Sequence, residues 1–172
     1  MAYLWQEVGR SGTKWIDSGA IKMADQFEPR GFFGEFEHSI DSKNRLTLPS
    51  AIRKKIDEDE RLILSSGFDK CLTLYPYDGW EKFLEEAGAA GPRSEARQLR
   101  RAFSSRASEV SPDSQGRLVI PSKLKEWAGI NDQVTVVGNF DNVELWSPER
   151  WEDYNEEIDL EAAAQEVFDN RQ

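Results

Sequence analysis

Two short loops place an aspartate four residues before an arginine, and each leads into an apolar run that ends in proline. They read Asp41-Ser-Lys-Asn-Arg45 and Asp113-Ser-Gln-Gly-Arg117. An aspartate and an arginine across such a tight turn can pair, which would hold the guanidinium in a fixed direction. The guanidinium is a planar fork of donors that suits both a phosphate and the O6/N7 edge of guanine. The loops therefore carry the residue types of a nucleic-acid contact.

The residues of the two loops differ in what they contribute. The residues expected to contact DNA, through a cation or an amide, are Lys43, Asn44, Arg45, Gln115 and Arg117. The residues expected to orient the arginines are Asp41 and Asp113. The residues alone are equally consistent with two roles for each Asp–Arg pair. The pair could orient the arginine for DNA contact, or it could only hold a hairpin together. That alternative stays open at this point.

The bases near the first loop form a local excess of positive charge. Residues 41–55 hold five bases against one acid, a net charge of +4, although the chain as a whole carries −10. Salt screens exposed charges beyond about 8 Å, so a local patch governs contact more than the chain total does. We interpret Arg53, Lys54 and Lys55 as a solvated helix face, with Arg53 and Lys54 as candidate phosphate contacts.

Both loops belong to an internal repeat with an offset of 113 − 41 = 72 residues. The ten-residue stretches that begin at Asp41 and Asp113 share six identical positions. At the same offset Phe68-Asp69 matches Phe140-Asp141. Self-similarity of this kind decides the architecture, so we interpret the chain as two copies of one unit.

Each copy is expected to form a strand, a loop, a strand, a short helix and a hairpin. In the first unit (35–78) we expect strands at 36–40 and 45–48, a helix at 51–56 after Pro49, and hairpin strands at 62–64 and 72–75. In the second unit (107–150) we expect a strand at 117–120, a helix after Pro121, and hairpin strands at 134–137 and 143–146.

The remaining segments flank the two units. The connector (79–106) predicts helices at 78–87 and 94–104 with a break at 88–92. The C-terminal part (151–172) continues a helix from Pro148 to about Ile158 and ends in a tail that we expect to be mobile. Residues 152–172 hold eight acids and one base. Residues 1–29 are expected to be a flexible extension.

Neither unit can bury itself well with strands this short and few. Two units that interleave into one barrel would solve the problem, and the repeat would then act as a pseudo-dimer within one chain. The expected fold class is α+β.

The doubled Asp-x-x-x-Arg loop, followed each time by Leu-x-[Leu/Ile]-Pro, resembles the MraZ family, whose members carry two AbrB/SpoVT-like units with this motif. Gly34-Glu35-Phe36-Glu37-His38 before the first loop and Glu109-Val110 before the second also look like the family. The resemblance covers residues 31 to about 154. It implies a double swapped-hairpin (AbrB-like) β-barrel with short flanking helices.

The resemblance also implies a function. It implies a bacterial transcriptional regulator that binds repeated DNA elements upstream of the division and cell-wall gene cluster, with protomers assembled into a ring. The resulting expectation is a sequence-specific repressor without a cofactor, located in the cytoplasm with the nucleoid. Its partners would be double-stranded promoter DNA and further copies of itself.

The chain departs from the family pattern within both loops. Gln115 stands where a lysine is frequent, so the second loop is expected to contribute less to DNA affinity. Asn44 stands where glycine is usual. Asparagine tolerates a left-handed backbone, so we expect the turn to be kept.

Other function classes are less well supported. A ring-shaped structural or protein-interaction scaffold, with incidental DNA binding, is the alternative that the acidic balance favours. The single histidine and the single cysteine, His38 and Cys71, match no zinc spacing, and there is no phosphate loop or nucleophile elbow. We therefore expect neither an enzyme nor a metal site. The longest apolar stretches are far shorter than the roughly 20 residues of a membrane helix.

Overall fold

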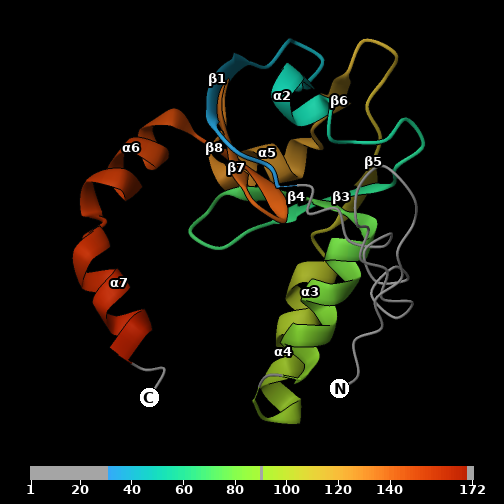
Figure 1. Cartoon of the computed structure of the whole chain (residues 1–172). Coiled ribbons are helices and arrows are strands. Elements are labelled where there is room, and N and C mark those ends of the chain that lie inside the picture. The colour runs from blue at the N-terminus through green and yellow to red at the C-terminus, as the bar shows by residue number, and fades with distance from the viewer. Residues whose placement is uncertain (1–30, 90, 170–172) are drawn as a thin grey trace, which may run out of the picture. The chain divides into compact units, whose positions relative to one another are not determined.

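The computed structural model of the chain describes residues 31–89 and 91–169 (Figure 1). The extension expected at 1–29 lies outside the described residues. The described part is an α+β fold with an antiparallel six-stranded sheet, a two-stranded ribbon and several helices. No helix of these residues is long and apolar enough to cross a membrane.

The two copies of the repeat form the same elements in the same order. The first copy contains β1 (Glu35–Ser39), β2 (Arg45–Thr47), α2 (Ser50–Arg53), β3 (Leu62–Ser66) and β4 (Leu72–Pro76). The second contains β5 (Ser108–Val110), β6 (Arg117–Val119), α5 (Ser122–Ala128), β7 (Gln133–Asn139) and β8 (Asn142–Trp146). The prediction that each copy forms two strands, a short helix and a hairpin is therefore confirmed.

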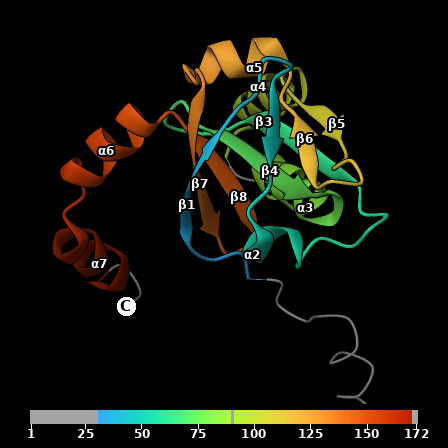
Figure 2. The ribbon, with the colours of Figure 1, turned by 90° about the horizontal axis from the view of Figure 1, so that it is seen from above.

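Each copy pairs its first strand with the hairpin of the other copy. The six-stranded sheet has the order β1-β7-β8-β4-β3-β5, so β1 of the first copy lies beside β7 of the second, and β5 of the second lies beside β3 of the first. Figure 2 shows β7 between β1 and β8. The remaining strands, β2 and β6, pair with each other. The expected interleaving of the copies is confirmed. The described pairings give an open strand order and a separate ribbon, without a closed barrel.

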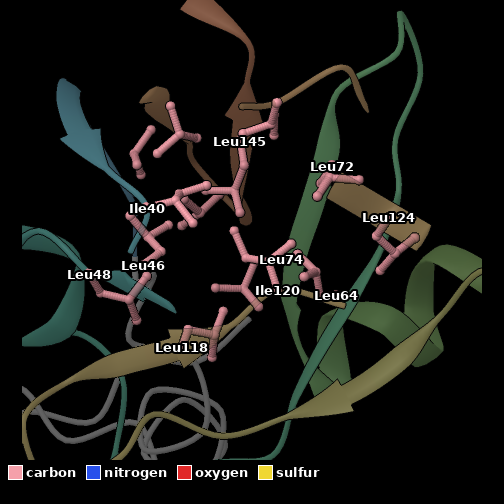
Figure 3. Packing of buried hydrophobic residues seen from close by; sticks show 14 of the residues in the cluster. Ile40, Leu46, Leu48, Leu64, Leu72, Leu74, Leu118, Ile120, Leu124 and Leu145 are labelled. Atoms are coloured by element: carbon pink, nitrogen blue, oxygen red, sulfur yellow. The ribbon is translucent and has the colours of Figure 1, made fainter. Parts of the chain in front are cut away.

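The main core lies where the two copies meet. Leu46 and Leu118 face each other at the centre of the β2–β6 ribbon, and both are fully buried. Figure 3 shows the ribbon residues Leu46 and Leu118, and Leu48 and Ile120 that directly follow the two ribbon strands, packed near Leu74 of the hairpin. Because the same cluster takes leucines, isoleucines and valines from both copies, neither copy holds a core of its own.

A helical hairpin covers the opposite face of β3. Its helices are α3 (Tyr77–Ala89) and α4 (Arg93–Ser104), which pack side by side (Figure 1). Ile63 points away from the main core and packs with Trp80 and Phe103. The rings of Phe83 and Phe103 meet edge to face at 4.9 Å.

Two predicted helix limits are wrong. The helix expected at 51–56 ends at Arg53, because the amides of Lys55 and Ile56 bond to carbonyls only three residues back and tighten the chain into turns. The break expected at 88–92 starts too early, because α3 runs through Gly88 to Ala89. A glycine inside a helix costs only about 1 kcal/mol, which packing against a neighbouring helix can offset. Gly88 leaves room for the side chain of Arg100 on α4.

The C-terminal segment is helical where a mobile tail was expected. Helix α6 (Pro148–Glu157) is followed by α7 (Leu160–Asp169). The carboxylate of Asp159 accepts hydrogen bonds from the amides of Glu161 and Ala162, which caps the start of α7. An aspartate before a run of alanine and glutamate is a pattern that indicates the start of a helix. The expectation of a mobile tail was based on the acidic charge of the segment and did not consider this pattern.

Candidate nucleic-acid interface

The two Asp-x-x-x-Arg loops stand at the ends of the β2–β6 ribbon. In the antiparallel register Arg45 lies opposite Val119, and Thr47 lies opposite Arg117. Alternate residues of a strand point to opposite faces, and Leu46 and Leu118 point into the core. Arg45 and Arg117 therefore share the outer face of the ribbon, as diagonal neighbours.

Each loop holds its arginine with the same set of bonds. In the first loop, the Asp41 Oδ2 atom accepts from Arg45 Nε at 2.7 Å and pairs with Arg45 Nη2 at 2.6 Å. In the second loop, Asp113 Oδ2 accepts from Arg117 Nε at 2.8 Å and pairs with Nη2 at 2.7 Å. The prediction that the aspartate and arginine pair across the turn is confirmed in both copies.

The other carboxylate oxygen of each aspartate shapes the loop backbone. Asp41 Oδ1 accepts from the amides of Lys43 and Arg45, and Asp113 Oδ1 accepts from those of Gln115 and Arg117. With both oxygens occupied, the aspartate fixes the turn and the arginine together. We call each aspartate and arginine, with these bonds, a clamp.

The clamps keep both aspartates ionised. Hydrogen bonds from the side chain and amide of Arg45 lower the pKa of Asp41 from 3.8 to about 2. Those from Arg117 lower the pKa of Asp113 by the same route to about 2. Each clamp therefore stays a charge pair at neutral pH, and each guanidinium keeps a further edge for an outside acceptor.

The fourth position of each loop adopts a left-handed backbone. Asn44 has a φ of 56° and Gly116 has a φ of 74°. The expectation that asparagine keeps the turn that glycine usually makes is thus confirmed. The carbonyl oxygen of Asn44 accepts from the amide of Ile120, and that of Gly116 accepts from the amide of Leu48. Each loop is therefore anchored to the strand end of the other copy.

The side chain of Asn44 is held by the second copy. Its Nδ2 atom donates to Ser122 Oγ at 3.1 Å, and its Oδ1 atom accepts from Lys125 Nζ at 3.0 Å. Both ends of the amide are occupied, so Asn44 would have to leave these partners to read a base edge. Ser122 and Lys125 lie on α5 and were not singled out from the sequence.

Arg53 holds the second loop in return. Its Nη1 atom donates to the carbonyl oxygen of Gln115 at 3.2 Å, and its side chain lies against Gly116. Arg53 and Lys125 are equivalent in the repeat, because 125 − 53 = 72. Each thus reaches from a helix of one copy to the loop of the other. The repeat offset identifies Arg53 and Lys125 as equivalent positions, but it does not predict that each contacts the loop of the other copy.

The other predicted contact residues lie near the clamps and are exposed. Lys43 and Gln115 occupy equivalent positions in the two loops, so one loop offers a cation where the other offers an amide. Lys54 directly follows α2 and is exposed as well. Arg45 and Arg117 thus lie on the ribbon strands, and Lys43 and Gln115 lie in the loops that precede these strands. Lys54 stands at the end of the adjacent helix.

The single cysteine is unsuited to nucleophilic chemistry. Burial raises the pKa of the Cys71 thiol to about 12, so the thiol stays protonated at neutral pH. His38 lies on β1, and Cys71 directly precedes β4. These strands are not neighbours in the sheet.

A family model matches the chain twice, once for each copy of the repeat. The model is described as "MraZ protein, putative antitoxin-like" and matches residues 32–102 and 103–171. The chain belongs to the MraZ family. This finding agrees with the resemblance that the doubled clamp sequence indicated.

Curated relatives match the chain over most of its length. A protein of Clostridium tetani named Transcriptional regulator MraZ is 41% identical over 139 residues, which covers 79% of this chain and 96% of the relative. Proteins of the same name from Syntrophomonas wolfei and Roseiflexus castenholzii are both 38% identical. The matches to these two cover 81% and 77% of this chain, and 95% and 92% of the respective relative.

Proposed function

We propose that this MraZ-family chain is a sequence-specific DNA-binding transcriptional regulator that acts as a repressor. The observation that carries the proposal is the pair of clamps, which hold Arg45 and Arg117 on the outer face of one ribbon. A guanidinium held in this way loses little freedom when it binds, which favours bidentate contact with guanine or phosphate. The name of the curated relatives supports the same function.

The proposed contacts divide between bases and phosphates. Arg45 and Arg117 read base edges or grip phosphates, Lys43 and Lys54 neutralise phosphates, and Gln115 reaches a base edge. Asp41 and Asp113 orient the arginines and touch no DNA. Asn44 contacts DNA only if it gives up Lys125 and Ser122, and Arg53 contacts phosphate only if it releases Gln115.

The fold and the assembly are part of the proposal. The two units (35–78 and 107–150) exchange strands, which supports a double swapped-hairpin barrel of the AbrB type. We propose that protomers form a ring, so that several ribbons meet successive DNA repeats upstream of the division and cell-wall genes. Linked sites of this kind raise avidity by roughly 10²–10⁴ without any new contact.

A scaffold that recruits a protein partner is the second candidate. The net charge of −10 and the uncharged Gln115 in the second loop favour it. The two candidates differ in their response to salt, because each phosphate that a protein neutralises releases counterions.

Salt dependence tests the proposal against the scaffold. Binding to a promoter duplex would be measured by isothermal titration at several concentrations between about 50 and about 200 mM NaCl. A regulator loses affinity with a slope of log K against log salt of about −0.9 for each phosphate contacted. A slope near zero, or no binding at the lowest salt, would favour the scaffold.

A further inference from the structure

The outer face of the β2–β6 ribbon carries an exposed valine beside its arginines. Four side chains of the two strands point outward, and they belong to Arg45, Thr47, Arg117 and Val119. Val119 is 54% exposed, although its neighbour Leu118 is fully buried and packs in the main core (Figure 3). Of these four outward side chains, that of Val119 alone is apolar, and it lies within the candidate nucleic-acid interface.

Val119 is the direct cross-strand neighbour of Arg45. The amide of Ile120 donates to the carbonyl oxygen of Asn44, whereas the amide of Arg45 donates to the carboxylate of Asp41. Arg45 and Val119 therefore form a pair without backbone hydrogen bonds between them, which is the kind of antiparallel pair whose side chains lie closer. Their Cβ atoms are expected to be about 4.5–5.5 Å apart. Whatever the clamped guanidinium of Arg45 contacts, Val119 lies beside it.

The equivalent position in the other half of the ribbon holds a threonine. Thr47 and Val119 are equivalent in the repeat, because 119 − 47 = 72, and Thr47 lies opposite Arg117. Thr47 is exposed like Val119. Both residues are β-branched and suit a strand, so strand formation on this exposed face does not by itself require an apolar side chain. The apolar residue at position 119 therefore points to an apolar contact on that side of the ribbon.

We propose that Val119 contacts the C5 methyl group of a thymine next to the guanine that Arg45 reads. The inference rests on the proposed function and names one base of the DNA element. A two-stranded β-ribbon fits the major groove, where thymine presents its C5 methyl group to apolar side chains. Successive bases of a strand are about 3.4 Å apart, so the spacing between Arg45 and Val119 spans one base step.

The chemistry of valine also indicates which base is rejected. Cytosine presents an amino group in the major groove at the position where it must find an acceptor. Val119 has no polar atom in its side chain, so a cytosine at this step would lose a hydrogen bond to water without gaining another. Thymine loses nothing of that kind through its methyl group. The contact therefore favours thymine over cytosine as well as over a thymine without its methyl group.

The preference for thymine should be confined to the Arg45 half of the ribbon. In the other half, Thr47 stands beside Arg117 and offers a hydroxyl group that both donates and accepts, together with a methyl group. A side chain with both properties contacts more than one kind of base. The two halves of the ribbon therefore differ in how strictly they select the base beside the arginine.

Replacing thymine with deoxyuridine tests the inference, because the exchange removes only the C5 methyl group. Each thymine in the shortest upstream duplex that binds the full-length chain would be replaced in turn, and the affinity would be measured by fluorescence anisotropy. We expect one position at which the exchange weakens binding of the wild type about fourfold, which is the loss expected when one methyl group leaves an apolar contact. This measurement needs no variant of the protein.

The variant Val119→Ala identifies the side chain that makes the contact. It should bind the unmodified duplex roughly fourfold to tenfold more weakly than the wild type, and the effect of deoxyuridine at that one position should disappear. Thr47→Ala, at the equivalent position of the other half, is the matched control and should keep the effect at about fourfold. Circular dichroism checks that both variants fold.

Three outcomes separate the inference from the proposed function. If the wild type prefers the upstream duplex to a scrambled one but tolerates deoxyuridine at every position, the inference is overturned and the proposed function stands. If the effect of deoxyuridine persists in Val119→Ala, another residue contacts the methyl group and the inference is again overturned. A wild type that binds both duplexes equally would contradict the proposed function and, with it, the inference.

Discussion

The ammonium group of Lys125 lies 3.0 Å from the Oδ1 atom of Asn44, so a helix of the second copy holds the loop of the first. Arg53, the residue equivalent to Lys125 in the first copy, holds the second loop through the carbonyl of Gln115. The two loops are therefore positioned by each other's copies, and a disturbance in one copy should be felt in the loop of the other.

Replacing Lys125 with methionine should weaken DNA binding several-fold without changing its salt dependence. Lys125 positions Asn44 and neutralises no phosphate in the proposed complex, whereas a phosphate contact would contribute about −0.9 to the slope. Hydrogen exchange of the loop amides at 42–44 should become faster in the same variant, which reports the positioning without DNA. Lys123→Met, two residues away on the same helix, is the matched control. If the slope of log K against log salt became less negative by about 0.9 in Lys125→Met, Lys125 would contact a DNA phosphate directly.

Replacing Gly116 with alanine should destabilise the chain more than the same change at Gly91. Both glycines have positive φ angles, 74° and 77°, so both variants strain the backbone. A Cβ at position 116 would lie 2.5 Å from Cδ of Arg53, whereas the nearest atom at position 91 is 4.0 Å away. Displacing Arg53 breaks its hydrogen bond to Gln115, which adds about 1 kcal/mol to the loss in free energy of unfolding.

Chemical denaturation of the wild type and of the two glycine variants checks that difference. In an Arg53→Ala background the extra cost of Gly116→Ala should disappear, because the side chain that it displaces is already absent. An extra cost that persists in this background would show that Arg53 plays no part in the strain at Gly116.

The stability that the two clamps contribute should be lost only at very low pH. Because the pKa of Asp113 is lowered in the folded chain, its contribution to stability is complete above about pH 3.8 and disappears as the pH falls through about 2. An NMR titration of the carboxyl carbons should place the midpoint for Asp113 near 2 in the wild type. In Arg117→Ala the midpoint should return toward 3.8, while that of Asp41 stays near 2. A wild-type midpoint near 3.8 would mean that the clamp is open in solution.

Much of the candidate site followed from local sequence, because its main bonds are local. The clamp joins residues four apart, and the turn needs a left-handed residue directly before the arginine. The order of Asp41, Asn44 and Arg45 in the sequence is therefore enough to predict the geometry of the loop. The repeat offset extended the same prediction to Asp113 and Arg117. The interleaving of the copies also followed, since strands of three to seven residues cannot form a core within one copy.

The contacts between the copies were beyond sequence reasoning. The partner of Asn44 is 81 residues away at Lys125, and the partner of Arg53 is 62 residues away at Gln115. Nothing in the local pattern distinguishes these bases from a solvated helix face, which is how we interpret Arg53 from the sequence, with phosphate as a candidate contact. Helix α7 was missed for another reason, because its acidic composition resembles that of a mobile tail while Asp159 provides a helix cap.

The most direct test of the central claim is fluorescence anisotropy with a duplex from upstream of the chain's own gene cluster and a scrambled duplex. We predict tight binding of the wild type to the upstream duplex and a loss of roughly tenfold to hundredfold in Arg45→Ala and in Arg117→Ala, the range expected when a bidentate contact is removed. Lys82→Ala, which removes an exposed base from α3, should bind like the wild type. Equal affinity for both duplexes, with the two arginine variants unchanged, would contradict the account.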